Sequence, residues 1–176
     1  MNEVLKAIAN RSSTRAYTGQ KLTEEELNSL VIAGLQAPTS CNEQEIHITV
    51  LDGNNPILAE IEEEKNKSMG LYNPQNNFYC GAPTVMILSG NEEFYWSKVD
   101  AGIAAENIAI AAESMGLGSL YIGCIKDALS GTKKAYFANA LKFPEGYEFE
   151  VAIALGHKAV SKEQNEFDLD ARVTYL

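Results

Sequence analysis

Apolar positions recur along this 176-residue chain with two spacings, one typical of helices and one of strands. Helical spacing predicts helices at 2–10, 23–38, 55–70, 100–115 and 131–141. Runs rich in β-branched and apolar residues predict strands at 46–51, 84–89, 119–123 and 148–155. Because helices and strands are interleaved without a linker, residues 1–176 are expected to form a single domain of the α+β class. The polar segment after the last strand has little periodicity and is interpreted as wrapping a neighbouring chain.

The helix expected to begin at Thr23 carries its own start signal. Thr23 and Glu26 have the spacing of a capping box, in which each side chain hydrogen-bonds the backbone N–H of the other residue. Glu24 and Glu25 place negative charge at the positive end of the helix dipole. This helix start is therefore encoded locally.

The alanine-rich helix at 100–115 is apolar around most of its circumference. At 100° per residue its polar side chains fall within an arc of roughly 140°, which leaves roughly 220° apolar. A helix of this kind must be covered on nearly all sides. Two interpretations stay open: a central core helix within one chain, or a helix that also packs across a dimer interface.

Charge and composition exclude several classes of function. Lys and Arg number 14 against 24 Asp and Glu, so the formal net charge is −10 and broad binding to nucleic acid is not expected. No apolar stretch has the length that a bilayer requires, and residues 1–10 do not resemble a signal peptide. The three cysteines are widely spaced, which disfavours a disulfide framework or a zinc site. A cytoplasmic protein without membrane contact is expected.

The arginines are the clearest chemical signal. Only three occur, and Arg11 and Arg15 flank a run of hydroxyl side chains, Ser12-Ser13-Thr14. A guanidinium is a permanently charged fork that binds phosphate through two hydrogen bonds, and neighbouring hydroxyls add more. The segment is interpreted either as a phosphate cradle or as a solvated polar turn.

Motifs of other enzyme classes do not occur. The chain has no P-loop, and Gly116-x-Gly118 lacks the third glycine of a dinucleotide-binding fingerprint. The hydroxyl run follows a helix rather than the first strand, which argues against a flavodoxin. No G-x-S-x-G elbow is present, and His47 and His157 lack metal-ligand spacing. Neither a catalytic side chain nor a metal site is predicted.

Six motifs in order along the chain resemble those of the FMN-dependent nitroreductase family. They are Arg11–Tyr17, Ala37–Gln44, Ala82-Pro83, Asp100–Ser119, Tyr121–Gly123, and Ala154–His157 followed by Arg172. The resemblance covers nearly the whole chain. It implies an α/β/α sandwich with a mainly antiparallel central sheet, a long buried Ala-rich helix, and an interlocked homodimer that binds two FMN molecules between its subunits.

The resemblance also implies which residues hold the cofactor. Contacts to the phosphate, ribityl chain and pyrimidine edge fall to Arg11, Ser12, Ser13 and Arg15, and Arg172 joins the phosphate. The segment that reaches the flavin from the partner subunit supplies Pro38, Thr39, Ser40 and Asn42. An asparagine at the pyrimidine corresponds to Asn73, Asn76 or Asn77, of which Asn77 is preferred. The isoalloxazine near N5 is lined by Tyr121, Ile122, Gly123 and Cys124.

The implied activity is electron transfer from NAD(P)H through FMN to a nitroaromatic, a quinone or a similar acceptor, by a ping-pong mechanism. The cofactor carries the chemistry, so no protein acid or base is required. The alternatives are an FMN carrier or redox-sensing protein, or a flavoenzyme for reductive dehalogenation or azoline oxidation. The chain departs from the family at Gln44-Glu45-Ile46, where Gln-Pro-Trp is usual, and at Ser12, which replaces an arginine.

Overall fold

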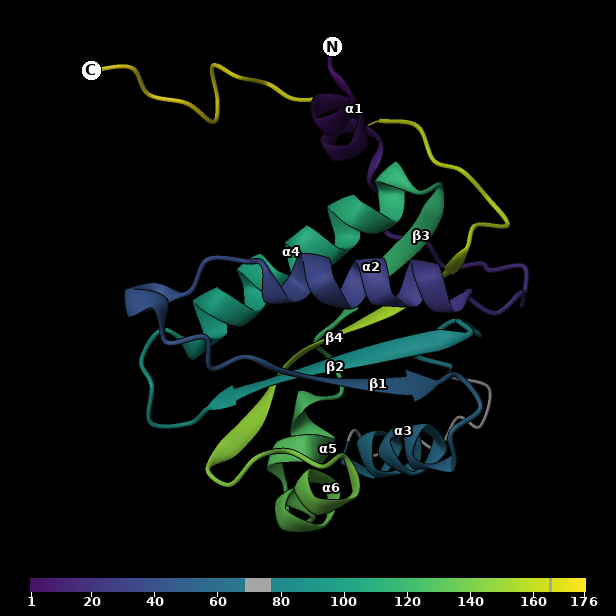
Figure 1. Cartoon of the computed structure of the whole chain (residues 1–176), viewed down its shortest axis with the longest axis vertical. Coiled ribbons are helices and arrows are strands. Elements are labelled where there is room, and N and C mark those ends of the chain that lie inside the picture. Colours follow the sequence, from purple (N-terminus) through teal and green to yellow (C-terminus); the bar gives the residue numbers. More distant parts are fainter. Residues whose placement is uncertain (69–76, 165) are drawn as a thin grey trace.

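The computed structural model describes residues 1–68, 77–164 and 166–176. Within these ranges one antiparallel sheet has the strand order β1-β2-β4-β3. The strands are β1 (His47–Asp52), β2 (Thr84–Asn91), β3 (Leu117–Ile122) and β4 (Tyr147–His157). The central strand β2 is almost fully buried, and β4 is buried over residues 152–156, because helices cover both faces of the sheet (Figure 1).

The helices form two layers, one on each side of the sheet. One layer contains α1 (Glu3–Asn10), α2 (Glu24–Leu35) and α4 (Ser97–Ser114). The opposite layer contains α3 (Pro56–Ser68), α5 (Lys126–Ser130) and α6 (Lys134–Ala140). Alternation along β2 serves both layers, since Met86 and Leu88 enter the α2/α4 core while Val85 and Ile87 enter the other. The α/β/α arrangement and the mainly antiparallel sheet are confirmed.

A close approach of helices fixes the α2/α4 layer. A Cβ atom on Gly34 would lie 2.9 Å from Cδ1 of Ile108 and 3.0 Å from Cδ1 of Ile48. The absence of a side chain at this position therefore lets α2 press against both α4 and β1.

Thr23 caps α2 as expected, since the reciprocal hydrogen bonds with Glu26 are both present.

Several element boundaries differ from the expectation. The Ala-rich helix begins at Ser97, and β3 begins at Leu117, directly after Gly116 turns the chain with φ of 76°. The helix expected at 131–141 is only Lys134–Ala140, and the short α5 precedes it. Both helices are too short for local propensity to define and depend on packing against the sheet. The expected helix end at Gly70 and the loop up to residue 76 lie outside the described residues.

One side of α4 remains exposed in the single chain. Ala104, Ala105 and Ile108 are buried, whereas Val99 and Ile103 are 49% and 37% exposed. The fold therefore covers only part of the wide apolar arc. Within the described ranges, no helix combines the length and apolar character that a membrane crossing requires.

Candidate functional site

The 11–18 loop is fixed to β3 and to the end of β4 by backbone hydrogen bonds. The amide of Thr14 donates to the carbonyl of Ser119 at 2.8 Å, and the amide of Thr18 donates to the carbonyl of His157 at 3.0 Å. The loop thus continues the sheet at its β3 edge. A polar, irregular sequence obtains a defined backbone in this way, because two of its amides are satisfied by the sheet.

Side chains lock the same loop from beneath. Thr14 is 3% exposed, and the Tyr17 hydroxyl lies within hydrogen-bond distance of the Thr14 carbonyl (3.1 Å) and the Ala154 carbonyl (3.2 Å). A Cβ atom on Gly118 would lie 2.5 Å from Oγ1 of Thr14, so the loop settles on β3 only where that strand has no side chain. Gly118 is therefore required for the 11–18 loop to pack against β3.

Arg11, Glu106 and Tyr121 form a polar chain between three elements. The Nε of Arg11 lies 3.5 Å from Oε1 of Glu106 on α4. The Tyr121 hydroxyl, on β3, donates to the other carboxylate oxygen of Glu106. Burial raises the pKa of Tyr121 well above its ordinary value, and the Glu106 carboxylate raises it further. Tyr121 is therefore a neutral donor that, with Arg11, holds Glu106 in place.

A polar hollow of about 200 Å³ opens beside Arg11, next to its sequence neighbours Asn10 and Ser12. It is lined by Asn10, Ser12, Glu113, Lys158, Ser161 and Lys162. The ammonium of Lys158 lies 2.9 Å from each carboxylate oxygen of Glu113. Hydroxyl and ammonium donors gathered around one hollow suit an anionic group. Of the residues expected from sequence, Ser12 lines this hollow.

The segment expected to reach a flavin in the partner subunit lies at the start of α4. It comprises Pro38, Thr39, Ser40 and Asn42, which are exposed or half-buried. The amide of Ser40 donates to Asp100 Oδ2 at 2.8 Å. Asp100 lies six residues before Glu106, about 9 Å along the helix axis. Within one chain this segment and the Arg11 loop therefore occupy different parts of α4.

The end of β3 is where a ligand could contact both backbone and side-chain atoms. Ile122 is 2% exposed and points into the α3/α5/α6 core, so only its backbone is available to a ligand. Gly123 and Cys124 are exposed directly after the strand. Burial raises the pKa of the Cys124 thiol above its ordinary value.

Asn77 lies near a different hollow, of about 220 Å³, whose lining includes Lys21 and Asp52. Lys21 and Asp52 pair at 2.5 Å across its rim. The structure therefore does not join Asn77 to the Arg11–Glu106–Tyr121 chain. The competing candidates Asn73 and Asn76 lie outside the described residues.

The remaining expected cofactor residues differ in position. Ser13 pairs with Ser119 in a short parallel bridge, and Arg15 is exposed on the same loop. Arg172 is exposed in the C-terminal segment, which passes α1 and extends away from the body of the chain (Figure 1). Among the described residues, no hydrogen bond or ion pair joins Arg172 to the 11–15 loop.

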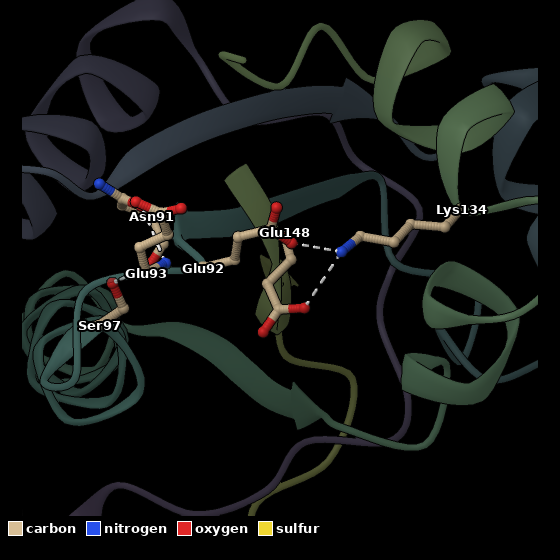
Figure 2. Close-up of polar contacts among 6 residues, drawn as sticks. All are labelled: Asn91, Glu92, Glu93, Ser97, Lys134 and Glu148. Atoms are coloured by element: carbon tan, nitrogen blue, oxygen red, sulfur yellow. Dashed lines mark hydrogen bonds and ion pairs between the residues drawn. The ribbon is translucent and has the colours of Figure 1, made fainter. Parts of the chain in front are cut away.

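Another hollow, of about 570 Å³, contains none of the expected site residues. It lies at the turn between β2 and α4 and is strongly acidic. Figure 2 shows Lys134 between two of its carboxylates, with Nζ 2.5 Å from Glu92 and 3.5 Å from Glu148. Burial and the charge of Glu148 raise the pKa of Glu150 to about 7. The two ion pairs of Lys134 join α6 to Glu92 and to Glu148 on β4, so the acidic cluster has a structural role.

Sequence reasoning missed Glu106, Lys158 and Lys162. It weighed the arginines as phosphate ligands and passed over two lysines after the last strand. Lys158 directly follows β4, and Lys162 comes four residues later. Glu106 had no local signal. Its partners lie 95 residues before it and 15 residues after it along the chain, so only the fold brings them together.

A family model described as "Nitroreductase family" matches residues 8–157. Among curated relatives, an FMN reductase (NADPH) of Bacillus subtilis is 33% identical over 172 residues, covering 90% of this chain and 67% of the relative. An FMN reductase [NAD(P)H] of the same organism is 29% identical, covering 72% of this chain. The chain spans only 56% of that second relative's length.

Solved structures show the same architecture over the whole chain. A nitroreductase with bound FMN from Desulfitobacterium hafniense superposes with a TM-score of 0.88 at 30% identity, covering 100% of this chain and 99% of that one. A nitroreductase with bound FMN from Bacteroides fragilis gives a TM-score of 0.88 at 26% identity, with 100% of both chains covered. The likeness therefore includes both helical layers and the sheet.

Replacing Gly118 with alanine is expected to destabilise the seat of the 11–18 loop. The new methyl group would meet Thr14, so Gly118→Ala should lower the free energy of unfolding by about 1–3 kcal/mol in urea denaturation. Thr14→Ala removes both threonine atoms within 2.7 Å of that methyl group, and the double variant should recover part of the loss. Equal stability of Gly118→Ala and the parent would contradict this packing.

Proposed function

The chain belongs to the nitroreductase family, and we propose that it is an FMN-dependent oxidoreductase that passes electrons from NAD(P)H to a small organic acceptor. The proposed acceptor is a nitroaromatic, a quinone or a similar compound. One observation carries the proposal: the 11–18 loop, fixed to β3 and β4, presents Arg11 and Ser12 next to a hollow rich in hydroxyl and ammonium donors. FMN is the cofactor that this donor set and the family both support.

The residues present fit the phosphate end of FMN. A phosphate monoester needs several hydrogen-bond donors and positive charge, and Ser12, Ser161, Lys158 and Lys162 supply both. Arg11 turns Nε toward Glu106, and its two terminal nitrogens are the ones that grip a phosphate. In this proposal Arg172 reaches a phosphate only through the C-terminal segment, which extends from the body of the chain.

The chain positions and tunes the ring rather than acting as acid or base. When bound, FMN supplies hydride chemistry, taking reducing equivalents from a nicotinamide and giving them to an acceptor. Ser13 and Arg15 are proposed to meet the ribityl chain and the pyrimidine edge, where the positive charge of Arg15 favours the reduced ring. Gly123 and Cys124, which are exposed directly after β3, would line the isoalloxazine of bound FMN near N5.

A homodimer completes the proposed site. Apolar side chains are exposed on three neighbouring helices of one layer, among them Val4 and Leu5 on α1, Ile32 and Leu35 on α2, and Val99 on α4. An apolar surface of this extent indicates a protein partner. A second copy seated there would bring its own 38–42 segment toward the Arg11 loop.

The free cysteines Cys41, Cys80 and Cys124 favour a reducing compartment such as the cytoplasm.

Arg11→Ala is expected to weaken FMN binding by roughly ten- to a hundredfold. A charge-assisted hydrogen bond contributes about 1.5–3 kcal/mol, which corresponds to that factor. The dissociation constant is measured by titrating apoprotein with FMN and following flavin fluorescence. Lys67→Ala, which makes the same change in net charge at an exposed position on α3, should leave FMN affinity within about twofold. Equal FMN affinity of Arg11→Ala and the parent would remove Arg11 from the site.

Steady-state kinetics separate an enzyme from a flavin carrier. With NAD(P)H varied at several fixed concentrations of a quinone or nitro compound, double-reciprocal plots should give parallel lines, the pattern of a ping-pong reaction. Turnover is expected at about 1–100 per second. A yellow protein that oxidises NAD(P)H no faster than free FMN would instead be a carrier. A protein that binds no FMN would defeat both functions.

A further inference from the structure

Arg11 has a fixed backbone, but its long side chain needs a further contact to be oriented. The residue caps the C-terminal end of α1, where its amide donates to the carbonyl of Ala7 at 2.9 Å. The guanidinium lies several rotatable bonds away from this anchor, and the side chain is 26% exposed. A free arginine side chain loses rotamer entropy when it binds a ligand, and this loss is smaller where another group already holds it.

The carboxylate of Glu106 is the group that lies beside this guanidinium. Its Oε1 is 3.5 Å from Nε of Arg11, and this is the ion pair that Arg11 makes within the part of the chain that the structure describes. Nε is one corner of the planar guanidinium fork. A carboxylate at that corner leaves the end of the fork, with its two terminal nitrogens, for a second anion.

Glu106 is itself held from two sides. It lies on α4 between Ala105 and Ile108, both 0% exposed, so the core fixes the backbone that carries it. Its second carboxylate oxygen accepts the hydroxyl of Tyr121. Tyr121 is paired with Ile153 of β4 in the sheet, and its side chain packs against the α2/α4 core. A buried helix and the sheet therefore set the position of this carboxylate.

The hydroxyl of Tyr121 stays a donor because it stays protonated. Burial raises the pKa of Tyr121 well above its ordinary value, and the Glu106 carboxylate raises it further. A phenol has one proton, and here that proton is directed to Glu106. The contacts thus run from β3 through α4 to the 11–18 loop, with each side chain oriented by the one before it.

We propose that Glu106 is a positioning residue of the phosphate site: held by Tyr121, it orients the guanidinium of Arg11 toward the phosphate of FMN. The inference rests on the proposed FMN function, because the phosphate is the group that Arg11 would bind. Arg11 touches the cofactor in this arrangement, whereas Glu106 and Tyr121 act through Arg11.

A negative charge behind Arg11 has two opposite effects on FMN affinity. It repels the phosphate, which weakens binding, and it holds Arg11 in the binding orientation, which strengthens binding. Glu106→Gln changes both effects at once, so its net sign is undefined. Glu106→Asp separates them, because it keeps the charge and withdraws the carboxylate by one methylene from Arg11 and Tyr121.

Glu106→Asp is expected to weaken FMN binding by about three- to tenfold, the factor for one ordering hydrogen bond. Affinity for riboflavin, which has no phosphate, should stay unchanged in the same variant, because Arg11 serves the phosphate. Both dissociation constants are measured by titrating apoprotein and following flavin fluorescence. Glu60→Asp is the matched control: Glu60 lies on α3 in the opposite layer and also accepts a tyrosine hydroxyl, that of Tyr136 at 2.6 Å. It should leave FMN affinity unchanged.

A double-mutant cycle decides whether Glu106 acts through Arg11. In the Arg11→Ala background, Glu106→Asp should have no further effect on FMN affinity, because the group that it orients is gone. Tyr121→Phe removes the hydroxyl that holds Glu106 and serves as a second variant. It should also weaken FMN binding in the parent and lose this effect in the Arg11→Ala background. Urea unfolding of each apoprotein confirms that the variants compared are folded.

The outcomes separate failure of the inference from failure of the function. If Glu106→Asp weakens FMN binding equally with and without Arg11, or weakens riboflavin binding as much as FMN binding, Glu106 has a general structural role and the inference is overturned. FMN affinity equal to that of the parent overturns it as well. In each of these cases a parent chain that binds FMN keeps its proposed function. A parent chain that binds no FMN defeats that function and the role of Glu106 with it.

Discussion

Backbone pairing of the 11–18 loop with β3 and with the end of β4 is the constraint on which the candidate site depends. A loop with this polar composition would otherwise sample many conformations and bind a phosphate only after being ordered. The Thr14 and Thr18 amides donate to strand carbonyls, and the Tyr17 hydroxyl donates to the carbonyl of Thr14. Gly118, which has no side chain, leaves room for Thr14 to pack on β3. Arg11 and Ser12 are therefore presented from an ordered backbone, which would lower the entropy lost on the proposed binding of a phosphate.

Helix α4 positions the other segments of the candidate site. Its acidic residues each meet a different functional segment: Asp100 the 38–42 segment, Glu106 the Arg11 loop, and Glu113 the lysine after β4. The apolar remainder of the helix packs on the sheet or lies exposed beside α1 and α2. One rigid helix thus sets the spacing of the parts contributed by one chain, and a second copy would supply the segment that lies too far along the axis.

Local signals in the sequence predicted much of this fold, and nonlocal contacts explain the rest. Thr23 and Glu26 encode a helix start by themselves, so that boundary was confirmed. The short α5 was missed because its formation relies on burying Ala128 and Leu129 against the opposite core. The Arg11 loop was predicted as a phosphate site from its residue types, and that role stays a prediction. The role of Glu106 could not be predicted, since nothing near it in sequence is its partner.

Hydrogen exchange of the backbone amides, followed by mass spectrometry with and without FMN, tests the central claim most directly. In the apoprotein, the peptide covering residues 11–18 should already exchange more slowly than an unstructured chain, because the sheet holds two of its amides. FMN should slow this peptide further, while peptides from α3 should change little. An 11–18 peptide that exchanges as an unstructured chain in both states, indifferent to FMN, would contradict the account.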